Sequence, residues 1–84
     1  MTLVVTVNKL NSSGEPDPEP LNGGPVPDML TAVELISKLH YPGLSFMIKR
    51  KDDNNVDMLI TKPDGEVETC RITVLKRYYS IAPA

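Results

Sequence analysis

Apolar and polar residues alternate with a period of two along three stretches in the C-terminal half of the chain. These stretches are residues 44–49, 56–61 and 69–74. Successive side chains of a β-strand point to opposite faces, so the alternation is typical of strands with one buried face. The Asn- and Asp-rich residues 51–55 and the Pro-Asp-Gly of residues 63–65 separate the stretches and favour tight turns. The pattern therefore predicts two successive β-hairpins, with the last strand running on beyond its alternating part.

The N-terminal half predicts one further strand and one helix. Residues 2–10 alternate and are rich in β-branched side chains, which suit a pleated surface. Asp28 can cap a helix over residues 28–40, and Pro42 ends it by disfavouring the α-region for the residue before it. The helix has an apolar stripe with a period of 3.6 residues, made of Met29, Ala32, Val33, Leu35, Ile36 and Leu39.

These elements predict an α+β fold in a single small domain over residues 1–84, with the order β-α-β-β-β. One amphipathic helix packs on one face of a four-stranded, mainly antiparallel sheet. The chain has one Phe, three Tyr and no Trp, so the core is expected to be aliphatic. The residues expected in it are Leu3, Val5, Val7, Val33, Ile36, Leu39, Phe46, Ile48, Met58, Ile60, Ile72 and Val74.

Residues 11–27 form a proline-rich acidic loop between the first strand and the helix. The loop contains five prolines and three glycines, and its Pro-Asp-Pro-Glu-Pro run favours extended or irregular backbone. Long loops in compact domains are usually functional or disordered. One interpretation is a solvated connector, and the other is an acidic arm that docks on a partner or on the basic residues of the same chain.

The net charge of −2 is distributed unevenly along the chain. Before Met29 there are four acids and one base, and from Met29 onward there are seven acids and eight bases. The folded part is thus close to neutral, unlike a dedicated nucleic-acid-binding protein. The single cysteine excludes an internal disulfide. No signal sequence and no apolar run of about 20 residues is apparent, so a cytoplasmic protein without a membrane partner is expected.

Residues that could carry catalysis or bind a metal do not form a recognisable motif. The single His40 is expected at the helix end, where the helix dipole favours it, and Cys70 is expected on the inward face as a small apolar side chain. The acids of residues 52–57 lack the spacing of a calcium loop, and Gly23-Gly24 lacks the lysine of a phosphate-binding loop. We therefore expect no enzyme activity, no metal and no cofactor.

The sheet face away from the helix, here called the open face, is one candidate binding surface. Alternation places on it a mixture of apolar and polar side chains, and a contiguous apolar patch there would mark a contact surface. A solvated face and a face covered by the proline-rich loop are the alternatives. The residues that could bind a partner or a second copy of the chain on this face are Met47, Leu59, Arg71 and Leu75.

Basic residues provide a second candidate surface. They cluster where the second and fourth predicted strands end, and antiparallel pairing with the strand between them would bring both clusters to one end of the sheet. Tyrosines beside the bases could stack on nucleic-acid bases or pack on a protein. This basic end consists of Lys49, Arg50, Lys51, Lys76, Arg77, Tyr78 and Tyr79. Nearby Asp52, Asp53 and Asp57 would partly neutralise it.

Taken together, the sequence favours a small non-catalytic module that acts through protein–protein contact. Chains of this size without a motif are typical of accessory or inhibitory proteins, phage-encoded ones among them, although this is an analogy of composition only. Nucleic-acid binding through the basic strand ends and Tyr78/Tyr79 is the alternative.

Overall fold

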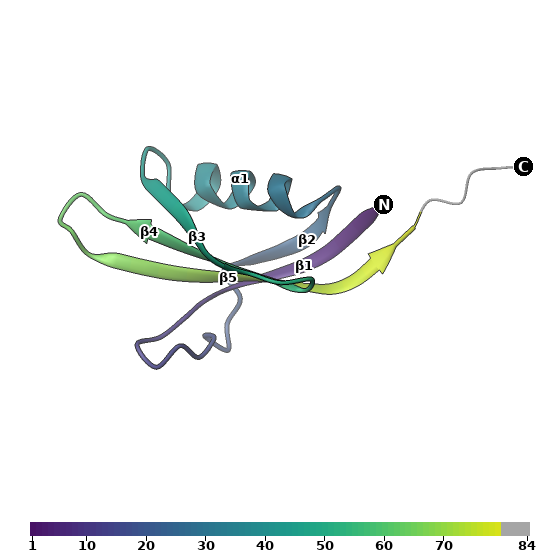
Figure 1. Ribbon diagram of the computed structural model, residues 1–84, viewed down its shortest axis with the longest axis horizontal. Helices are drawn as coiled ribbons and strands as arrows, with labels where there is room; N and C mark the ends of the chain where they lie inside the picture. Colours follow the sequence, from purple (N-terminus) through teal and green to yellow (C-terminus); the bar gives the residue numbers. More distant parts are fainter. Residues whose placement is uncertain (80–84) are drawn as a thin grey trace, which may run out of the picture.

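The computed structural model describes residues 1–79, which contain one helix and five strands (Figure 1). Residues 80–84, the end of the predicted domain, lie outside the described residues. All strand pairs are antiparallel, and the order across the sheet is β2-β1-β5-β4-β3. The predicted α+β class, with an antiparallel sheet and one helix on one face, is confirmed. The elements are β1 (Thr2–Lys9), β2 (Asn22–Val26), α1 (Met29–His40), β3 (Ser45–Lys51), β4 (Asn55–Thr61) and β5 (Val67–Tyr78).

The sheet contains one strand more than the hydrophobic pattern predicted. β2 lies within the proline-rich segment and has the sequence Asn-Gly-Gly-Pro-Val, which shows no alternation and is rich in poor β-formers. Its pairing with β1 places Val26 opposite Leu3 and Gly24 opposite Val5. Gly23 also approaches β1 closely, since an added Cβ would lie 3.1 Å from the carbonyl oxygen of Val5. The strand therefore forms because the chain returns along β1, and not through local propensity.

α1 is held at both ends by side-chain hydrogen bonds. The Asp28 carboxylate accepts a hydrogen bond of 2.7 Å from the backbone N–H of Thr31, and this bond lowers the pKa of Asp28. The cap satisfies one of the free N–H groups at the start of the helix, as the sequence predicted. At the other end, Nδ2 of Asn22 lies 3.0 Å from Nε2 of His40. The histidine thus joins the helix end to β2.

The hydrophobic core lies between α1 and the sheet, and it is most deeply buried on β4 and β5. Met58, Ile60 and Ile72 on β4 and β5 are completely buried. On the helix, only the side chains that point straight at the sheet are buried. The full core is Leu3, Val5, Val7, Val26, Ala32, Val33, Ile36, Tyr41, Val56, Met58, Ile60, Cys70 and Ile72, with Val74 packed against it.

Three residues assigned to the core from the pattern lie at its margins instead. Leu39 is 64 % exposed, Phe46 is 39 % exposed and Ile48 is 42 % exposed, so their assignment was wrong. The reason is geometric, because five strands about 4.8 Å apart span about 19 Å from edge to edge. A helix with its side chains is only about 10–12 Å wide. One helix cannot cover the whole sheet, and the apolar side chains at the margins stay exposed.

Since residues 22–26 are β2, only the first part of the predicted proline-rich loop is a loop, and it lies on the side of the sheet opposite α1 (Figure 1). It is anchored at its base, where the backbone N–H of Asp17 donates to the carbonyl oxygen of Lys9 at 2.7 Å. Its tip is turned on itself, because the side-chain oxygen of Asn11 accepts hydrogen bonds of 2.9 Å from the N–H groups of Ser13 and Glu15. Docking of this loop on a partner stays a prediction.

Truncation of a central core residue should destabilise the protein strongly. Ile72 is completely buried, so Ile72→Ala should lower the free energy of unfolding by roughly 2–5 kcal/mol through lost burial and the cavity left behind. The matched control is Leu39→Ala on the exposed flank of α1, for which a change within about 0.5 kcal/mol is expected. Urea unfolding monitored by circular dichroism measures both. Equal losses in the two variants would contradict the core described above.

Candidate functional site

The two edges of the sheet differ in whether another strand could pair with them. The β2 edge contains Pro25, which has no N–H, and Gly24 with a φ of +136°. Both features discourage strand pairing. β3, at the other edge, contains no proline or glycine, and all seven of its residues are exposed. Among the described residues, β4 is the only strand that pairs with β3.

The hydrogen-bond ladder determines which backbone groups of β3 point away from the sheet. The β4–β5 hairpin closes with a 2.8 Å hydrogen bond from the N–H of Lys62 to the carbonyl oxygen of Glu66. Backbone groups alternate in direction along antiparallel strands, so the N–H and C=O groups of the odd-numbered residues of β4 point toward β3. Leu59 is one of these, and Met47 lies opposite it. The N–H and C=O groups of the neighbouring Phe46 and Ile48 therefore point outward, with no strand to receive them.

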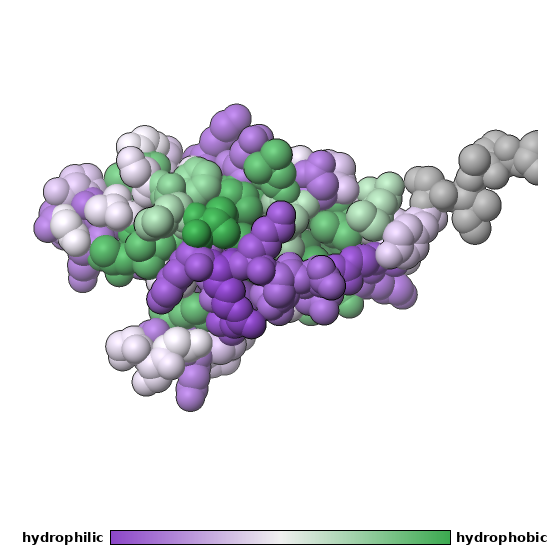
Figure 2. Space-filling model, in the orientation of Figure 1, coloured by the Kyte–Doolittle hydropathy of each residue, from purple (hydrophilic) through white to green (hydrophobic). Residues whose placement is uncertain are grey.

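An apolar groove adjoins these free backbone groups on the helix side of β3. The side chains of Phe46 and Ile48 form its floor, because they lie opposite the buried Ile60 and Met58. Leu30 of α1, 69 % exposed, stands on its opposite wall. We call this the edge groove; it has a volume of about 200 Å³ and is lined by Met29, Leu30, Val33, Glu34, Phe46, Ile48, Lys51 and Val56. Figure 2 shows hydrophobic side chains gathered between α1 and β3, with a strip of hydrophilic residues below them.

A bulge in β3 changes the positions of its three basic residues. The register of β3 with β4 shifts between Ile48 and Arg50, so that Lys49 is the extra residue. Beyond the bulge, Lys51 lies opposite the buried Val56 and its side chain lines the edge groove. Arg50 donates to Oδ2 of Asp52 at 3.1 Å. Within residues 1–79, Lys49 and Lys51 have no carboxylate within 4.0 Å, so their charges face solvent.

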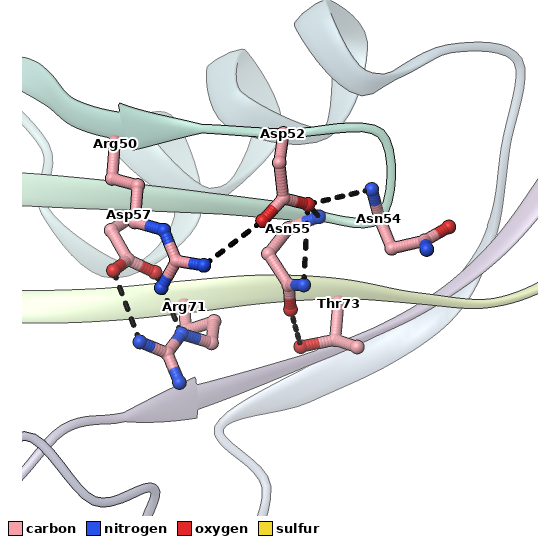
Figure 3. A network of polar contacts seen from close by, with 7 residues as sticks. All are labelled: Arg50, Asp52, Asn54, Asn55, Asp57, Arg71 and Thr73. Atoms are coloured by element: carbon pink, nitrogen blue, oxygen red, sulfur yellow. Dashed lines mark hydrogen bonds and ion pairs between the residues drawn. The ribbon is translucent and has the colours of Figure 1, made fainter.

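The open face has an ion pair at its centre rather than an apolar patch. Arg71 donates to both carboxylate oxygens of Asp57, at 2.8 and 3.1 Å, and Asp57 is only 6 % exposed (Figure 3). One row further along the sheet, the Thr73 hydroxyl donates to Oδ1 of Asn55 at 3.0 Å. Both pairs join β4 to β5 across the register of the sheet. The Asp57 bond also raises the pKa of Arg71. The charge of this arginine is therefore used within the fold and not for binding a partner.

The apolar residues proposed for the open face do not all come together. Met47 and Leu59 lie directly opposite each other on β3 and β4. Leu75, 64 % exposed, occupies a bulge in β5, where the register with β1 shifts. It is six residues along β5 from Thr69, the partner of Leu59, which corresponds to about 20 Å. The polar Arg71 and its neighbours lie between them, so a single patch through all four predicted residues does not form.

The remaining residues of the basic end also lie where strand pairing predicted, but part of their charge is used internally. Arg77 donates to Oδ1 of Asn54 at 2.8 Å and to the backbone of the β3–β4 turn. The Lys76 ammonium lies 5.0 Å from the ring centre of Tyr78, a cation–π distance. Tyr78 and Tyr79 are both exposed. The structure therefore brings the two basic clusters to one end and pairs their arginines with the adjoining turn.

A buried polar cluster lies near the C-terminal end of α1. The Tyr41 hydroxyl lies 2.9 Å from Sγ of Cys70, and both residues are buried. Burial raises the pKa of both groups, and their contact raises that of Tyr41 further. Burial disfavours the charge of nearby Glu68, but Lys9 at 3.1 Å, the Tyr41 hydroxyl and Lys62 together outweigh it and lower the Glu68 pKa. A neutral, buried thiol is unreactive, so the cluster supports packing rather than nucleophilic chemistry.

Residues 1–79 contain neither a candidate metal cluster nor a helix that could span a membrane. No group of three or more His, Cys, Asp or Glu side chains in this part of the chain is arranged to hold a metal ion. The helix found there is too short to cross a bilayer.

The sequence interpretation missed the edge groove, because it placed Phe46 and Ile48 in the core. Two signals were present in the sequence. Phe46, Met47 and Ile48 are three consecutive apolar residues, which a strand with one solvated face does not need. The three bases that follow them resemble the charged residues by which edge strands avoid aggregation. Neither signal identifies an edge by itself.

In comparisons with known proteins, no protein-family model, no curated protein and no solved structure matches this chain.

Removal of Arg71 should destabilise the fold, because Asp57 would remain buried without its partner. Arg71→Met should lower the free energy of unfolding by about 2–3 kcal/mol. Asp57→Leu combined with Arg71→Met should lose less than the sum of the two single variants, since no unpaired charge is left. Lys62→Met is the control, because Lys62 lies 4.0 Å from Glu68 and its side chain is 37 % exposed. Chemical denaturation measures all four variants, and strict additivity would mean that the pair is not coupled.

The Tyr41–Cys70 contact predicts a loss of stability at alkaline pH. The ordinary pKa values are 9.0 for Cys70 and 10.0 for Tyr41, and folding raises both. Between the unfolded and folded pKa values the unfolded chain binds fewer protons, so the free energy of unfolding falls as pH rises above about 9. The stability should be nearly constant from about pH 7 to pH 8.

Two variants separate the contributions of these groups. Cys70→Ala should flatten the decline near pH 9, and Tyr41→Phe should flatten the part above pH 10, because each removes one titrating group. Each variant is compared with its own stability at neutral pH, which corrects for the packing lost. An unchanged alkaline slope in both variants would contradict the proposed role of burial.

Proposed function

We propose that this protein is a non-catalytic binding module that takes up an extended segment of a partner protein along β3. The single observation that carries the proposal is the edge strand with outward-facing backbone groups at Phe46 and Ile48, next to an apolar groove. A strand added to such an edge gains main-chain hydrogen bonds, and pockets for alternate side chains provide specificity. The role that follows is that of an accessory or inhibitory protein.

The groove and the backbone of β3 would act together on the same incoming strand. In a pleated strand, alternate side chains point to the same face. The partner residues facing Phe46 and Ile48 would therefore enter the edge groove beside Leu30 of α1. Burial of these exposed side chains contributes about 25 cal/mol per Å² of apolar surface removed from water.

Nucleic-acid binding is a second candidate, and one observation favours it. Lys76 stacks on the exposed ring of Tyr78, and Tyr79 follows it in the chain. A cation beside exposed aromatic rings is the arrangement with which single-stranded nucleic acids are bound. The pairing of Arg50 and Arg77 with the β3–β4 turn reduces the charge available for phosphates. Fluorescence anisotropy with a single-stranded oligonucleotide at low salt tests this candidate, since phosphate-driven binding is strongest there.

The main proposal is tested by selecting peptides on the folded protein from a displayed library of random sequences of about ten residues, long enough to span an edge strand. Ile48→Ala removes the side chain and keeps the outward N–H, whereas Ile48→Pro removes both. Because proline is tolerated at sheet edges, both variants should fold, and circular dichroism checks this. Peptides selected on the wild type should bind Ile48→Ala more weakly and Ile48→Pro least of all.

Two outcomes would contradict the proposal. The first is a library from which no sequence is enriched on the wild-type protein. The second is enrichment of peptides that bind wild type and Ile48→Pro equally, which would place the binding surface elsewhere. As a further control, Leu39→Ala changes an exposed apolar residue outside the edge groove and should leave peptide binding unchanged.

A further inference from the structure

The positive charges of β3 lie at its C-terminal end only, and this limits which segments could pair with the strand. The first half of β3 is mainly apolar, with Phe46, Met47 and Ile48, and the second half is basic. Lys51 lines the edge groove, whereas Lys49 lines a hollow on the open face together with Asp57 and Arg71. Within residues 1–79 neither lysine is paired with a carboxylate, so the two faces of the edge each offer one free positive charge.

A negative charge at the other end of the edge groove strengthens this direction. The start of α1 lies near the end of β3, since Asp28 and Met29 line one hollow together with Lys51. Glu34, five residues further along α1, is therefore displaced by about 7.5 Å toward the Phe46 end of the groove. Asp28, Asp52 and Asp53 share the hollow at the Lys51 end, but Asp52 is paired with Arg50 and Asp28 caps α1. Within the edge groove itself, an acidic side chain is attracted by Lys51 and repelled by Glu34.

A second copy of this chain is a poor occupant of the same edge. Antiparallel pairing of two β3 strands would bring both sets of Lys49, Arg50 and Lys51 onto one shared edge. The whole strand has seven residues, or about 24 Å, so the lysines of the two copies would approach within about a Debye length of each other. Like charges at such distances oppose association, as basic residues on edge strands do generally.

We propose that the segment bound along β3 is an acidic–apolar strand of the pattern acidic–x–apolar–x–apolar, read from N- to C-terminus. This inference rests on the proposed function and names the chemistry of its partner. The antiparallel direction follows the rest of the sheet. It places the acidic residue opposite Lys51, the first apolar residue opposite Ile48 and the second opposite Phe46. The bulge at Lys49 supplies the extra residue on the β3 side of this register.

The test compares the peptides selected on wild type with those selected on the double variant Lys49→Glu/Lys51→Glu. On the wild type, acidic residues should be enriched on the N-terminal side of an alternating apolar pair. On the double variant, basic residues should replace them at the same positions. For a synthetic peptide from the wild-type pool, replacing its acidic residue by lysine should raise the Kd about fivefold, because one or two partly exposed ion pairs are lost. The effect should shrink at high salt.

The outcomes separate the two proposals. Alternating apolar peptides without an acidic preference, or with the acidic residue on the C-terminal side, would overturn the acidic pattern while leaving strand addition at β3 intact. No enrichment of any peptide would overturn both proposals. Sedimentation of the wild type as a dimer that Ile48→Pro converts to a monomer would replace the acidic segment by a second copy of the chain. Lys38→Glu, a charge reversal on an exposed lysine of α1 that lines neither hollow, is the control and should leave the selected sequences unchanged.

Discussion

The width of one helix is the constraint on which the rest of this structure depends. A helix about 10–12 Å wide lies over a sheet that spans about 19 Å, and its buried residues Ala32, Val33 and Ile36 leave the side chains of β3 exposed. β4 and β5 thus contain the completely buried side chains, and β3 contains none. The apolar side chains of β3 are consequently available for contact. The surface that we propose to be functional is a consequence of incomplete coverage, and no special motif is needed to create it.

The two edges of the sheet deal with their free backbone groups by different means. β2 carries a proline and a glycine with positive φ, so little remains for another strand to pair with. β3 keeps its hydrogen-bonding groups and apolar side chains, and it carries charge only in its second half. Charge on an edge opposes pairing with like-charged strands, including a second copy, but it favours an oppositely charged one. The same three basic residues can therefore prevent self-association and select a partner.

Polar pairing within the sheet separates the apolar side chains of the open face. Asp57 and Arg71 form a two-bond ion pair across β4 and β5, and Asn55 pairs with Thr73 beside it. A buried carboxylate costs free energy unless it is paired, so Arg71 is required where it is. Leu59 and Leu75 lie on either side of this polar row. Side chains that alternation assigns to one face thus lie on the same face without forming one patch. The edge of the sheet, and not the open face, therefore resembles a binding site.

The sequence by itself determined the helix, four of the five strands, their turns and the face of the side chains outside the bulges at Lys49 and Leu75, because these depend on periodicity and on residues close together in the chain. It also determined that the basic strand ends meet at the β3–β4 turn, since hairpin pairing is local. Only the tertiary structure decided that residues 22–26 form a strand, because their pairing with β1 overrides a poor local propensity. Only the tertiary structure decided that β3 lies at an edge. The alternation of apolar and polar residues is the same in a central strand and in an edge strand. Which of the two a strand becomes depends on the distant segments that pair with it. The pattern therefore assigned Phe46 and Ile48 to the core, although the position of α1 leaves them exposed.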